Sequence, residues 1–515
     1  MMREELFAKL RQDTRAAVAS HLRTLPMMTV ASVDSMEGLA RECLDEVRRA
    51  ALETWVEHLE QLARQLAGAC PKCGRPRRYK RRAEAPMRIV LLGAEVKVPK
   101  PYLECGHCGA PGVSILRLLT GLGDGAASAE LELAAAYCSS QHSYGKAALD
   151  LAVHHGQTVE RTAVRRMSLA VEVFAMIWVE TQRQVALARV SGEARVSGEA
   201  ELMLQGDGGT VRTGRLSPCA RGDAGYGKQS AKRGLPRRKR LTEKREVITL
   251  DVRVPGTVST AAMDVMVPLL SPEGERERRM LALASRAGLG DNTKMLGLGD
   301  LGSGLPQAFD EAFTGYDATY SGDWHHQRNY VHEAASVLTG LEASRWERQM
   351  RDAIWKRDER RRDALWKKAA EHRMPTLPAH LERCPVAALK TYLTNNWEYL
   401  RSAELKERGV DFVSARAEAQ VRDRTKARFM VPGAWCPENL EPKATLRAIV
   451  ADGRWEAFRA AYREHREVQF AKSLAQRLDE TLAKGGLDPV AVAPLREDLA
   501  RAEQARKPEE NRKAA

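Results

Sequence analysis

Two short apolar runs in the sequence each lead to a glycine followed by an aspartate. The first run reaches Gly206-Asp207-Gly208, and the second reaches Gly299-Asp300. A short apolar run closed by glycines predicts a buried strand, so the sheet would hold the acid at its end in place. The glycines beside the acid allow a ligand to approach the backbone closely. We therefore expect Asp207 and Asp300 to share one site, with Glu418 as its third acid.

A second set of residues with chemical potential consists of cysteines. Four of the nine cysteines form two Cys-x-x-Cys pairs, each followed by glycine: Cys70, Cys73, Cys105 and Cys108. Four thiolates suit tetrahedral zinc, and the glycines permit the tight turns that direct the sulfurs to the metal. The alternation of 87–98 predicts a hairpin between the pairs, which gives a zinc ribbon. His107 could replace one cysteine as a ligand, although the four cysteines suffice.

The charge of the whole chain favours a polyanionic partner. The 515 residues carry a formal net charge of +14, and such a basic protein most often binds nucleic acid. The alternative is a merely basic enzyme. The N-terminal segment is charged and lacks an apolar signal core, and no apolar run approaches the roughly 20 residues of a membrane span. We therefore expect a cytoplasmic protein.

The segment 143–172 predicts a helix-turn-helix. A short helix over Ser143–Ala152 is followed by a break at His154–Gln157 and by a second helix over Thr158–Glu172, with Thr158 as its N-cap. Such a pair can place its second helix on DNA. An ordinary helical hairpin is the alternative. The candidate DNA contacts on the second helix are Arg161, Arg165 and Arg166.

The residues around the two aspartates predict a mixed sheet flanked by helices. The segment 246–254 alternates as a strand that pairs with the first acid-bearing strand, and another strand is expected at 317–324. The stretch 221–245 has almost no apolar residues, which predicts a mobile loop. Its charges suit a DNA backbone, and the candidate contacts are Lys232, Arg233, Arg237, Arg238, Lys239 and Arg240.

A charged helical segment over 327–405 carries tryptophans at intervals. We interpret Trp346, Trp355 and Trp366 as core anchors; the alternative is a set of base-stacking platforms. A further helix is expected over 412–429. It would carry Glu418 and two candidate DNA contacts, Arg424 and Arg428.

The order of these motifs resembles that of the ISKra group of insertion-sequence transposases, relatives of the Mutator-like DDE transposases. The resemblance covers roughly residues 65–460. It rests on the ribbon CPKCG…CGHCG, the segment SYGKAALDLAVHHGQTVERTAVRR, the strands QGDGGTVR and LGLGDLGSG, the segment DWHHQRNYVHEA, and the run ARAEAQVRDRTKARF followed by Trp435, LRA and GRW.

The resemblance implies an RNase H-like catalytic core with a helical insertion before its last acid. Asp207, Asp300 and Glu418 match the three catalytic acids of the family. The implied activity is cutting of transposon ends and joining of these ends to target DNA. The implied partners are double-stranded DNA and further copies of the chain, because two ends must be joined. The implied location is the bacterial cytoplasm, in association with the nucleoid.

Two departures from the family pattern leave other functions open. The family has glycines where this chain has Ser414-Ala415-Arg416, and Asp300 is followed by leucine where glycine is more usual. The alternatives are a catalytically degenerate, transposase-derived DNA-binding protein and an RNase H-like nuclease without strand transfer. Asp323, His325 and His326 resemble a histidine-bearing segment of the family; they either orient DNA or a catalytic acid, or are structural.

Three carboxylates suit the implied chemistry. Two Mg²⁺ ions roughly 3.5–4 Å apart stabilise the attacking and leaving oxygens of a phosphodiester, and Mg²⁺ prefers oxygen ligands. Without ions, three clustered acids would repel one another. Asp207, Asp300 and Glu418 are therefore the expected ligands of Mg²⁺ or Mn²⁺, with carboxylates about 4–7 Å apart.

The predicted fold class is multidomain, α/β and α. The predicted regions are a helical N-terminal region (1–68), a zinc ribbon (69–115), a helical helix-turn-helix DNA-binding region (126–188), the first part of an RNase H-like core (200–330), a helical insertion (331–411), the last part of the core (412–460) and a charged helical tail (461–515).

Overall fold

The computed structural model describes most of the chain between residues 51 and 514. The described ranges are 53–62, 64–70, 72–92, 94–110, 112–121, 126–191, 198–218, 238–257, 262–267, 273–302, 304–338, 342–372, 384–410, 435–485 and 487–514, with single positions 8, 12, 15, 16, 19, 47, 50, 51, 412, 419 and 429. For some of these residues, among them 94–101, 216–218, 238–240 and 502–514, only the backbone is described.

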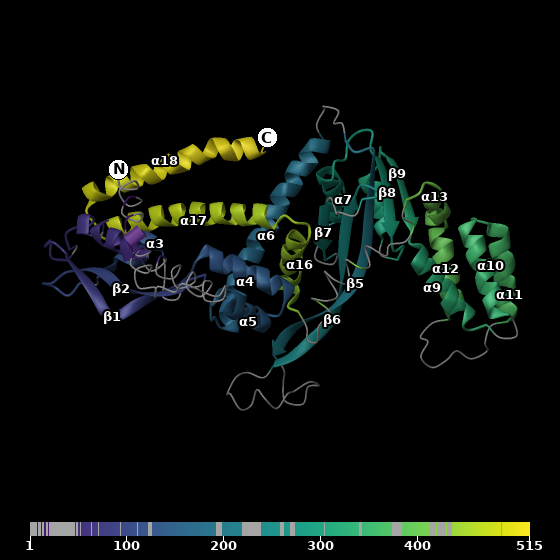
Figure 1. The fold of residues 1–515 in the computed structure, drawn as a ribbon, viewed down its shortest axis with the longest axis horizontal. Helices are drawn as coiled ribbons and strands as arrows, with labels where there is room; N and C mark the ends of the chain where they lie inside the picture. Colours follow the sequence, from purple (N-terminus) through teal and green to yellow (C-terminus); the bar gives the residue numbers. More distant parts are fainter. Residues whose placement is uncertain are drawn as a thin grey trace, which may run out of the picture. The chain divides into compact units, whose positions relative to one another are not determined.

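The chain divides into two compact units. Unit 1 comprises Met1–Val171 together with Arg459–Ala515, and unit 2 comprises Glu172–Phe458. Two long helices, α6 (Arg161–Val190) and α17 (Trp455–Ala483), continue from one unit into the other along the chain (Figure 1). Each unit has hydrophobic clusters of its own.

Unit 1 contains a four-stranded sheet in the order β3-β2-β1-β4. Strands β1 (Arg78–Leu91) and β2 (Ala94–Glu104) form an antiparallel hairpin whose register shifts between Arg82 and Met87. The predicted hairpin between the cysteine pairs is thus confirmed and is longer than expected. Two short strands, β3 (Val113–Ser114) and β4 (Ala126–Ala127), complete the sheet, and α3 (Ile115–Thr120) follows β3 directly.

Three successive helices follow the sheet of unit 1. Helix α4 (Ala129–Gln141) is capped by Ser128, and α5 (Tyr144–His155) is capped by Ser143. The expected break at His154–Gln157 is wrong in its first half, because both histidines belong to the last turn of α5 and Gly156 ends that helix with a φ of 64°. Thr158 is not an N-cap, since α6 begins only at Arg161. The helix–turn–helix order itself is present.

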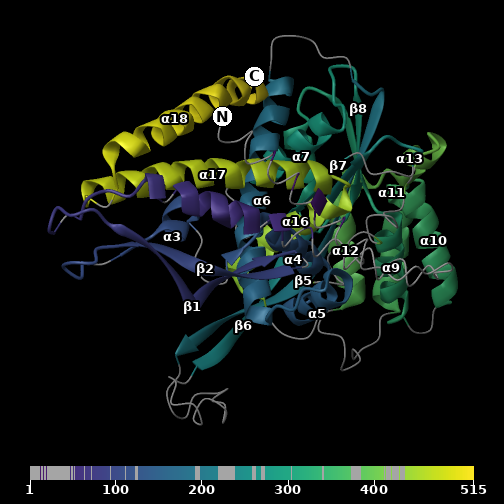
Figure 2. The same ribbon diagram turned by 60° about the vertical axis from the view of Figure 1, so that its left-hand side comes forward.

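The C-terminal tail folds onto the N-terminal part of unit 1. Helices α17 and α18 (Pro489–Ala514) lie side by side in both ribbon views (Figure 1 and Figure 2). Apolar residues of this tail form one hydrophobic cluster with residues of 56–66, β2 and α3. The buried members of the cluster are Val56, Leu59, Leu66, Leu103, Ile115, Leu118, Leu119, Leu474, Leu478, Leu487 and Val492. The predicted helical tail is therefore an integral part of a hydrophobic core.

Unit 2 is built around a five-stranded mixed sheet in the order β7-β6-β5-β8-β9. The strands are β5 (Glu201–Pro218), β6 (Arg238–Arg253), β7 (Ala262–Met266), β8 (Lys294–Gly299) and β9 (Asp317–Gly322). The first three pair in antiparallel fashion, whereas β8 runs parallel to β5 and β9 runs parallel to β8. The expected mixed sheet is confirmed.

Three details of the sheet differ from expectation. Strand β5 continues to Pro218, so Asp207 lies within it and not at its end. Strand β6 begins at Arg238, so the last part of the expected loop 221–245 is strand, because it pairs with β5 along its whole length. Strand β7 was not predicted; all five of its residues are buried, and such a run shows no strand alternation.

Helices cover both faces of the unit 2 sheet. Helices α7 (Glu275–Arg286) and α8 (Leu305–Ala312) contribute to a large cluster with Leu204, Ile248 and Leu250. On the other face, α16 (Pro437–Ala451) packs with Val211 and Val247, and α13 (Ser402–Glu407) packs with Met203. The alternation of side chains along β5 and β6 sends successive residues to these two faces.

A helical segment extends the large cluster beyond the sheet. It comprises α9 (Trp324–Ala335), α10 (Ala343–Trp355), α11 (Glu359–Glu371), α12 (Pro385–Asn396) and the 3₁₀ turn η3 (Trp397–Tyr399). Trp346 is buried and donates its indole N–H to the carbonyl of Leu365 at 3.0 Å. Trp366 packs against the same cluster, and Trp355 stacks edge-on with Trp324. The interpretation as a core anchor is confirmed for Trp346, whereas Trp366 packs half-buried against the cluster and Trp355 is half-buried and is not among the residues of the cluster.

Candidate catalytic acids and metal-ligating cysteines

The register of the sheet brings Asp207 and Asp300 to neighbouring positions. Gly206 of β5 pairs with Gly299 of β8, and each aspartate directly follows its glycine. Because β5 and β8 are parallel, the two acids follow this pair in the same direction, Asp207 within β5 and Asp300 just beyond the C-terminal end of β8. A Cβ atom on Gly299 would lie 2.3 Å from the carbonyl oxygen of Gly206, so only glycine fits there.

The same register continues to a third aspartate. Gly299 also pairs with Gly322 of β9, and Gly322 is followed by Asp323. Three adjacent parallel strands therefore each carry a Gly-Asp step at the same level of the sheet. The sequence contains six Gly-Asp dipeptides, and strand pairing is needed to show that these three align.

Asp323 has a structural role in addition to its place in this row. It is fully buried and caps α9 by accepting a hydrogen bond from the N–H of His325 at 2.9 Å. His326 Nε2 lies 3.8 Å from Asp323 Oδ2. These contacts favour a structural role for Asp323, His325 and His326 at the start of α9 over a role in orienting DNA or a catalytic acid.

Asp207 and Asp300 differ in their surroundings. Asp207 is 7% exposed, whereas Asp300 is half-buried and accepts a hydrogen bond from the N–H of Gly302 at 3.0 Å. Along β5 the alternation places Asp207 on the face of Met203, which packs against α13. Asp207 thus lies within β5 and Asp300 lies just beyond the C-terminal end of β8, and the two acids have unequal access to solvent.

A further carboxylate, Glu246, lies near Asp300. Burial raises the pKa of Glu246, the positive charge of Arg276 opposes this rise, and the negative charge of Asp300 adds to it. Glu246 Oε1 lies 2.9 Å from the point that a Cβ of Gly208 would occupy. Glu246 is not among the predicted site residues, although it stands at the start of an alternating segment of the sequence.

Several predicted site residues lie outside the described part of the chain. They are Glu418, the expected third acid, and the basic residues Lys232, Arg233, Arg237, Arg424 and Arg428. For Arg238, Lys239 and Arg240 the structure gives only the backbone, which belongs to β6. Among described residues, Asp207 and Asp300 do not belong to a compact group of three or more metal-ligating side chains.

The four predicted cysteines do form such a group. The Sγ atoms of Cys70 and Cys108 are 3.5 Å apart, and those of Cys73 and Cys105 are 3.4 Å apart. All four sulfurs lie within 4.8 Å of one another. A tetrahedral zinc site with Zn–S bonds of about 2.3 Å requires sulfurs about 3.8 Å apart, so this group could hold a metal such as zinc.

The turns around the cysteines prepare them for metal binding. Gly74 and Gly109 adopt φ angles of 70° and 63°, which confirms the expected tight turns. The backbone N–H groups of His107 and Cys108 lower the pKa of Cys105 to about 6, and a thiolate is the form that binds metal. His107 is exposed and forms a hydrogen bond with Arg75 at 2.8 Å, so it does not belong to the sulfur group.

The predicted DNA-contact arginines lie at the start of a long helix. Arg161, Arg165 and Arg166 occupy the first two turns of α6, and all three are exposed. Exposed guanidinium groups on one helical segment can reach a phosphate backbone. The structure therefore leaves these side chains accessible to a polyanion.

Within the described residues, none of the helices combines the length and the apolar character that a membrane crossing requires. No protein-family model matches the chain, and no curated protein matches it. The functional assignment therefore depends on the geometry described above.

Proposed function

We propose that this protein is a DDE-type DNA transposase of an insertion sequence, which cuts transposon ends and joins them to target DNA. The observation that carries the proposal is the shared register of Asp207 and Asp300 on neighbouring parallel strands. Two carboxylates fixed at the same level of two paired strands are suited to bind divalent cations.

The topology of unit 2 supports this proposal. Strands β7, β6 and β5 are antiparallel, and the two further strands β8 and β9 run parallel to β5. This is the arrangement that an RNase H-like sheet is expected to have. A fold alone does not determine a function, and the proposal therefore also rests on Asp207 and Asp300. In this proposal the helical segment 331–411 is the insertion that precedes the third acid, Glu418.

The acids would hold Mg²⁺ or Mn²⁺. When bound, such ions activate a water molecule and stabilise charge on the phosphate. Asp207 and Asp300 would fix the ions against the backbone of β5 and β8, and Glu418 would complete the ligand set. The burial of Asp207 limits competing solvent at one side of the site.

The remaining parts of the chain support a DNA partner. The net charge is +14, and the exposed arginines of α6 lie directly after a helix and a short turn. In the proposal the cysteine group binds a structural zinc ion, and the protein acts as a homo-oligomer on two double-stranded ends. Its place of action is the bacterial cytoplasm at the nucleoid.

The test is cleavage of a labelled duplex that carries the element's own end. Wild-type protein is expected to cut it with Mg²⁺ and to yield joined products. Asp207→Asn and Asp300→Asn are expected to reduce cutting at least about 100-fold, because each removes a metal ligand. DNA binding, measured in Ca²⁺, is expected to persist in both variants.

Asp317→Asn is the matched control, since Asp317 lies on the same sheet at the opposite end of β9 and is exposed. It is expected to cut like the wild type. Cutting without joined products would assign an RNase H-like nuclease instead. Specific binding without cutting by the wild type would assign a DNA-binding protein that has lost catalysis, and full activity of Asp207→Asn would refute the acid assignment.

A further inference from the structure

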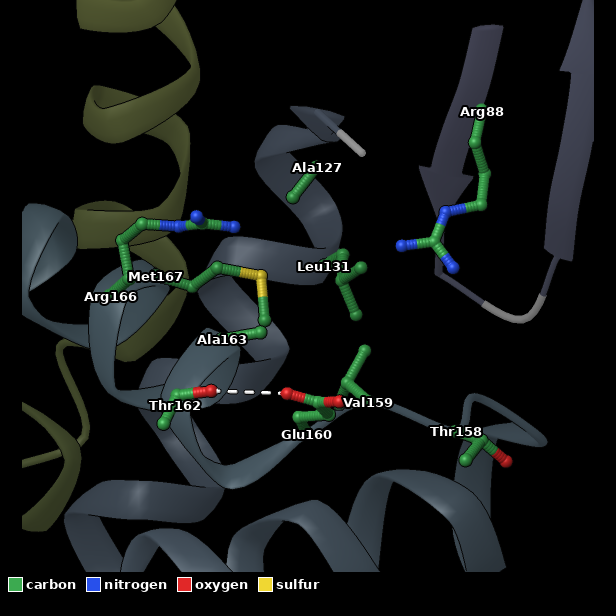
Figure 3. A pocket seen from close by; sticks show the side chains of 10 residues that line it. All are labelled: Arg88, Ala127, Leu131, Thr158, Val159, Glu160, Thr162, Ala163, Arg166 and Met167. Atoms are coloured by element: carbon green, nitrogen blue, oxygen red, sulfur yellow. Dashed lines mark hydrogen bonds between the residues drawn. The ribbon is translucent and has the colours of Figure 1, made fainter. Parts of the chain in front are cut away.

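Unit 1 contains a pocket of about 350 Å³ at the beginning of α6 (Figure 3). Its walls come from β1, β4, α4, the segment before α6 and the first turns of α6. The lining residues are Arg88, Ala127, Leu131, Thr158, Val159, Glu160, Thr162, Ala163, Arg166 and Met167. None of the four cysteines lines this pocket, and nothing above assigns it a role.

Cationic groups lie on opposite sides of this pocket. Figure 3 shows the guanidinium groups of Arg88, from β1, and Arg166, from α6, directed toward the same space. Two guanidinium groups from separate elements are suited to hold a phosphate by charge-assisted hydrogen bonds. Both arginine side chains are exposed, so the phosphate can stay near solvent.

The deeper part of the pocket is apolar. Leu131 is fully buried and Met167 is 4% exposed, and both side chains face the pocket beside Ala163. A flat apolar group would cover them favourably, and a methionine thioether makes good contacts with aromatic rings. The volume exceeds what one phosphate group needs and lies in the range of small-molecule sites.

An acceptor group completes the set. The carboxylate of Glu160 lines the pocket and accepts a hydrogen bond from the hydroxyl of Thr162 at 3.3 Å. A carboxylate opposes binding of a simple anion, but it can accept hydrogen bonds from the amino group of a nucleobase. The ligand that satisfies all three regions carries a phosphate, a flat aromatic face and an amino group.

We propose that this pocket receives one unpaired nucleotide of bound DNA. Its phosphate lies between Arg88 and Arg166, its base covers Leu131 and Met167, and an amino group of adenine, cytosine or guanine donates to Glu160. This inference rests on the proposed DNA-binding function and adds a mode of recognition to it. Extruding a base from a duplex costs a few kcal/mol, so DNA that already contains an unpaired base binds more tightly.

The experiment compares two labelled duplexes that differ by one unpaired adenine. Fluorescence anisotropy of the full chain is expected to show at least about fivefold tighter binding of the duplex with the unpaired base, since base stacking on a protein contributes this much. Arg88→Ala is expected to remove most of this preference. Arg117→Ala, an exposed arginine of α3 in the same unit, is the matched control and is expected to retain it.

A second variant tests the base contact. Wild-type protein is expected to bind a duplex with an unpaired adenine more tightly than one with an unpaired thymine, because thymine lacks an amino group. Glu160→Gln is expected to reduce this difference in affinity. Replacing adenine by 2-aminopurine adds a direct probe, because its fluorescence changes when the base leaves the stack and enters a protein pocket.

The outcomes separate the inference from the proposed function. Equal, tight binding of both duplexes would overturn the inference and leave DNA binding intact. No binding of either duplex would overturn both. If free dAMP bound in an Arg88-dependent way while the protein showed no preference for the duplex with the unpaired base, the inference would be overturned. The ligand of the pocket would then be a free nucleotide and not a nucleotide of bound DNA.

Discussion

Lys443 of α16 and Glu172 of α6 form an ion pair in which both side chains are fully buried. Removing two charges from water is costly, so such a pair adds little net stability, but removal of one partner leaves an uncompensated charge. We expect Lys443→Met to lower the free energy of unfolding by about 3–5 kcal/mol. Urea unfolding followed by circular dichroism measures this change.

The double variant tests whether the loss comes from the orphaned charge. Lys443→Met with Glu172→Leu is expected to recover most of the stability, since both charges are then absent. Lys367→Met, an exposed lysine of α11, is the control and is expected to change the free energy of unfolding by at most about 0.5 kcal/mol. Equal losses in the single and double variants would show that the two side chains are not coupled.

The cysteine group allows a second prediction at the residue scale. Purified wild-type protein is expected to contain one zinc ion per chain by elemental analysis, and Cys105→Ser is expected to contain none, because a serine hydroxyl is a poor zinc ligand. Cys436→Ser changes an exposed cysteine outside the group and is expected to keep the metal. Zinc retained in Cys105→Ser would argue for a different ligand set.

The acids show how far single residues could be predicted. A local signal, an apolar run closed by glycine, marks both Asp207 and Asp300 in the sequence, but this signal did not show that β5 continues beyond Asp207. Glu246 was missed because its closeness to Asp300 depends on the pairing of β5 with β6 and of β5 with β8. Such a proximity is a property of tertiary structure and leaves no periodic signal in the sequence.

At the scale of elements, charged side chains join α6, β7, α7 and α16 beside the unit 2 sheet. Arg183 Nη2 of α6 lies 3.1 Å from Asp264 Oδ2 of β7. Arg279 of α7 donates a hydrogen bond at 2.5 Å to Glu441 of α16. All four residues are buried, so these contacts fix the relative positions of the elements in a medium where charge interactions are strong.

Glu180 at the rim of this network gives a pH prediction. Burial alone would raise its pKa, but hydrogen bonds from Arg278 and Gln184 outweigh burial and lower the pKa to about 2, from an ordinary value of 4.5. A lowered pKa in the folded state stabilises the protein above pH 4.5, and this stability is lost as the pH falls toward 2. We expect Glu180→Gln to be less stable than the wild type at pH 7 and equally stable near pH 2.

Urea unfolding at pH 7, 4.5 and 2 measures the difference. Glu311→Gln is the control; this exposed glutamate of α8 is expected to behave like the wild type throughout. A difference between Glu180→Gln and the wild type that persists unchanged to pH 2 would show that lost packing, and not the carboxylate charge, causes the destabilisation.

The strands show which elements a sequence can specify. Alternation along Glu246–Arg253 predicted its strand correctly, because one face of that strand packs on the large cluster and the other on the cluster around α16. The length of β5 was underestimated, because Gly206, Gly208 and Gly209 suggest a strand end. Pairing with β6 extends the strand through these glycines, and that partner is distant along the chain.

At the scale of the whole molecule, unit 1 is assembled from both ends of the chain. The charged, helical pattern of residues 461–515 predicted helices but gave no sign of their partner. Tyr462 of α17 donates a hydrogen bond to Glu132 of α4 at 2.7 Å, and Arg477 donates to the carbonyl of Leu118 at 2.8 Å. These contacts join residues more than 300 positions apart, which local sequence patterns cannot reveal.

The last prediction concerns this closure of unit 1 by its tail. Leu478 of α17 is fully buried in the cluster that also contains Leu103 of β2. Leu478→Ala leaves a cavity between the tail and the ribbon and is expected to lower the free energy of unfolding by about 2–5 kcal/mol. Hydrogen exchange measured by mass spectrometry is expected to rise in peptides of β1 and β2, although the substitution lies far away in sequence.

Phe470→Ala removes a larger side chain from the same helix, but Phe470 is 44% exposed, so exchange in β1 and β2 is expected to stay as in the wild type. If Leu478→Ala accelerated exchange only within α17 and α18, the ribbon would fold without the tail, and the two ends of the chain would not share one cooperative core.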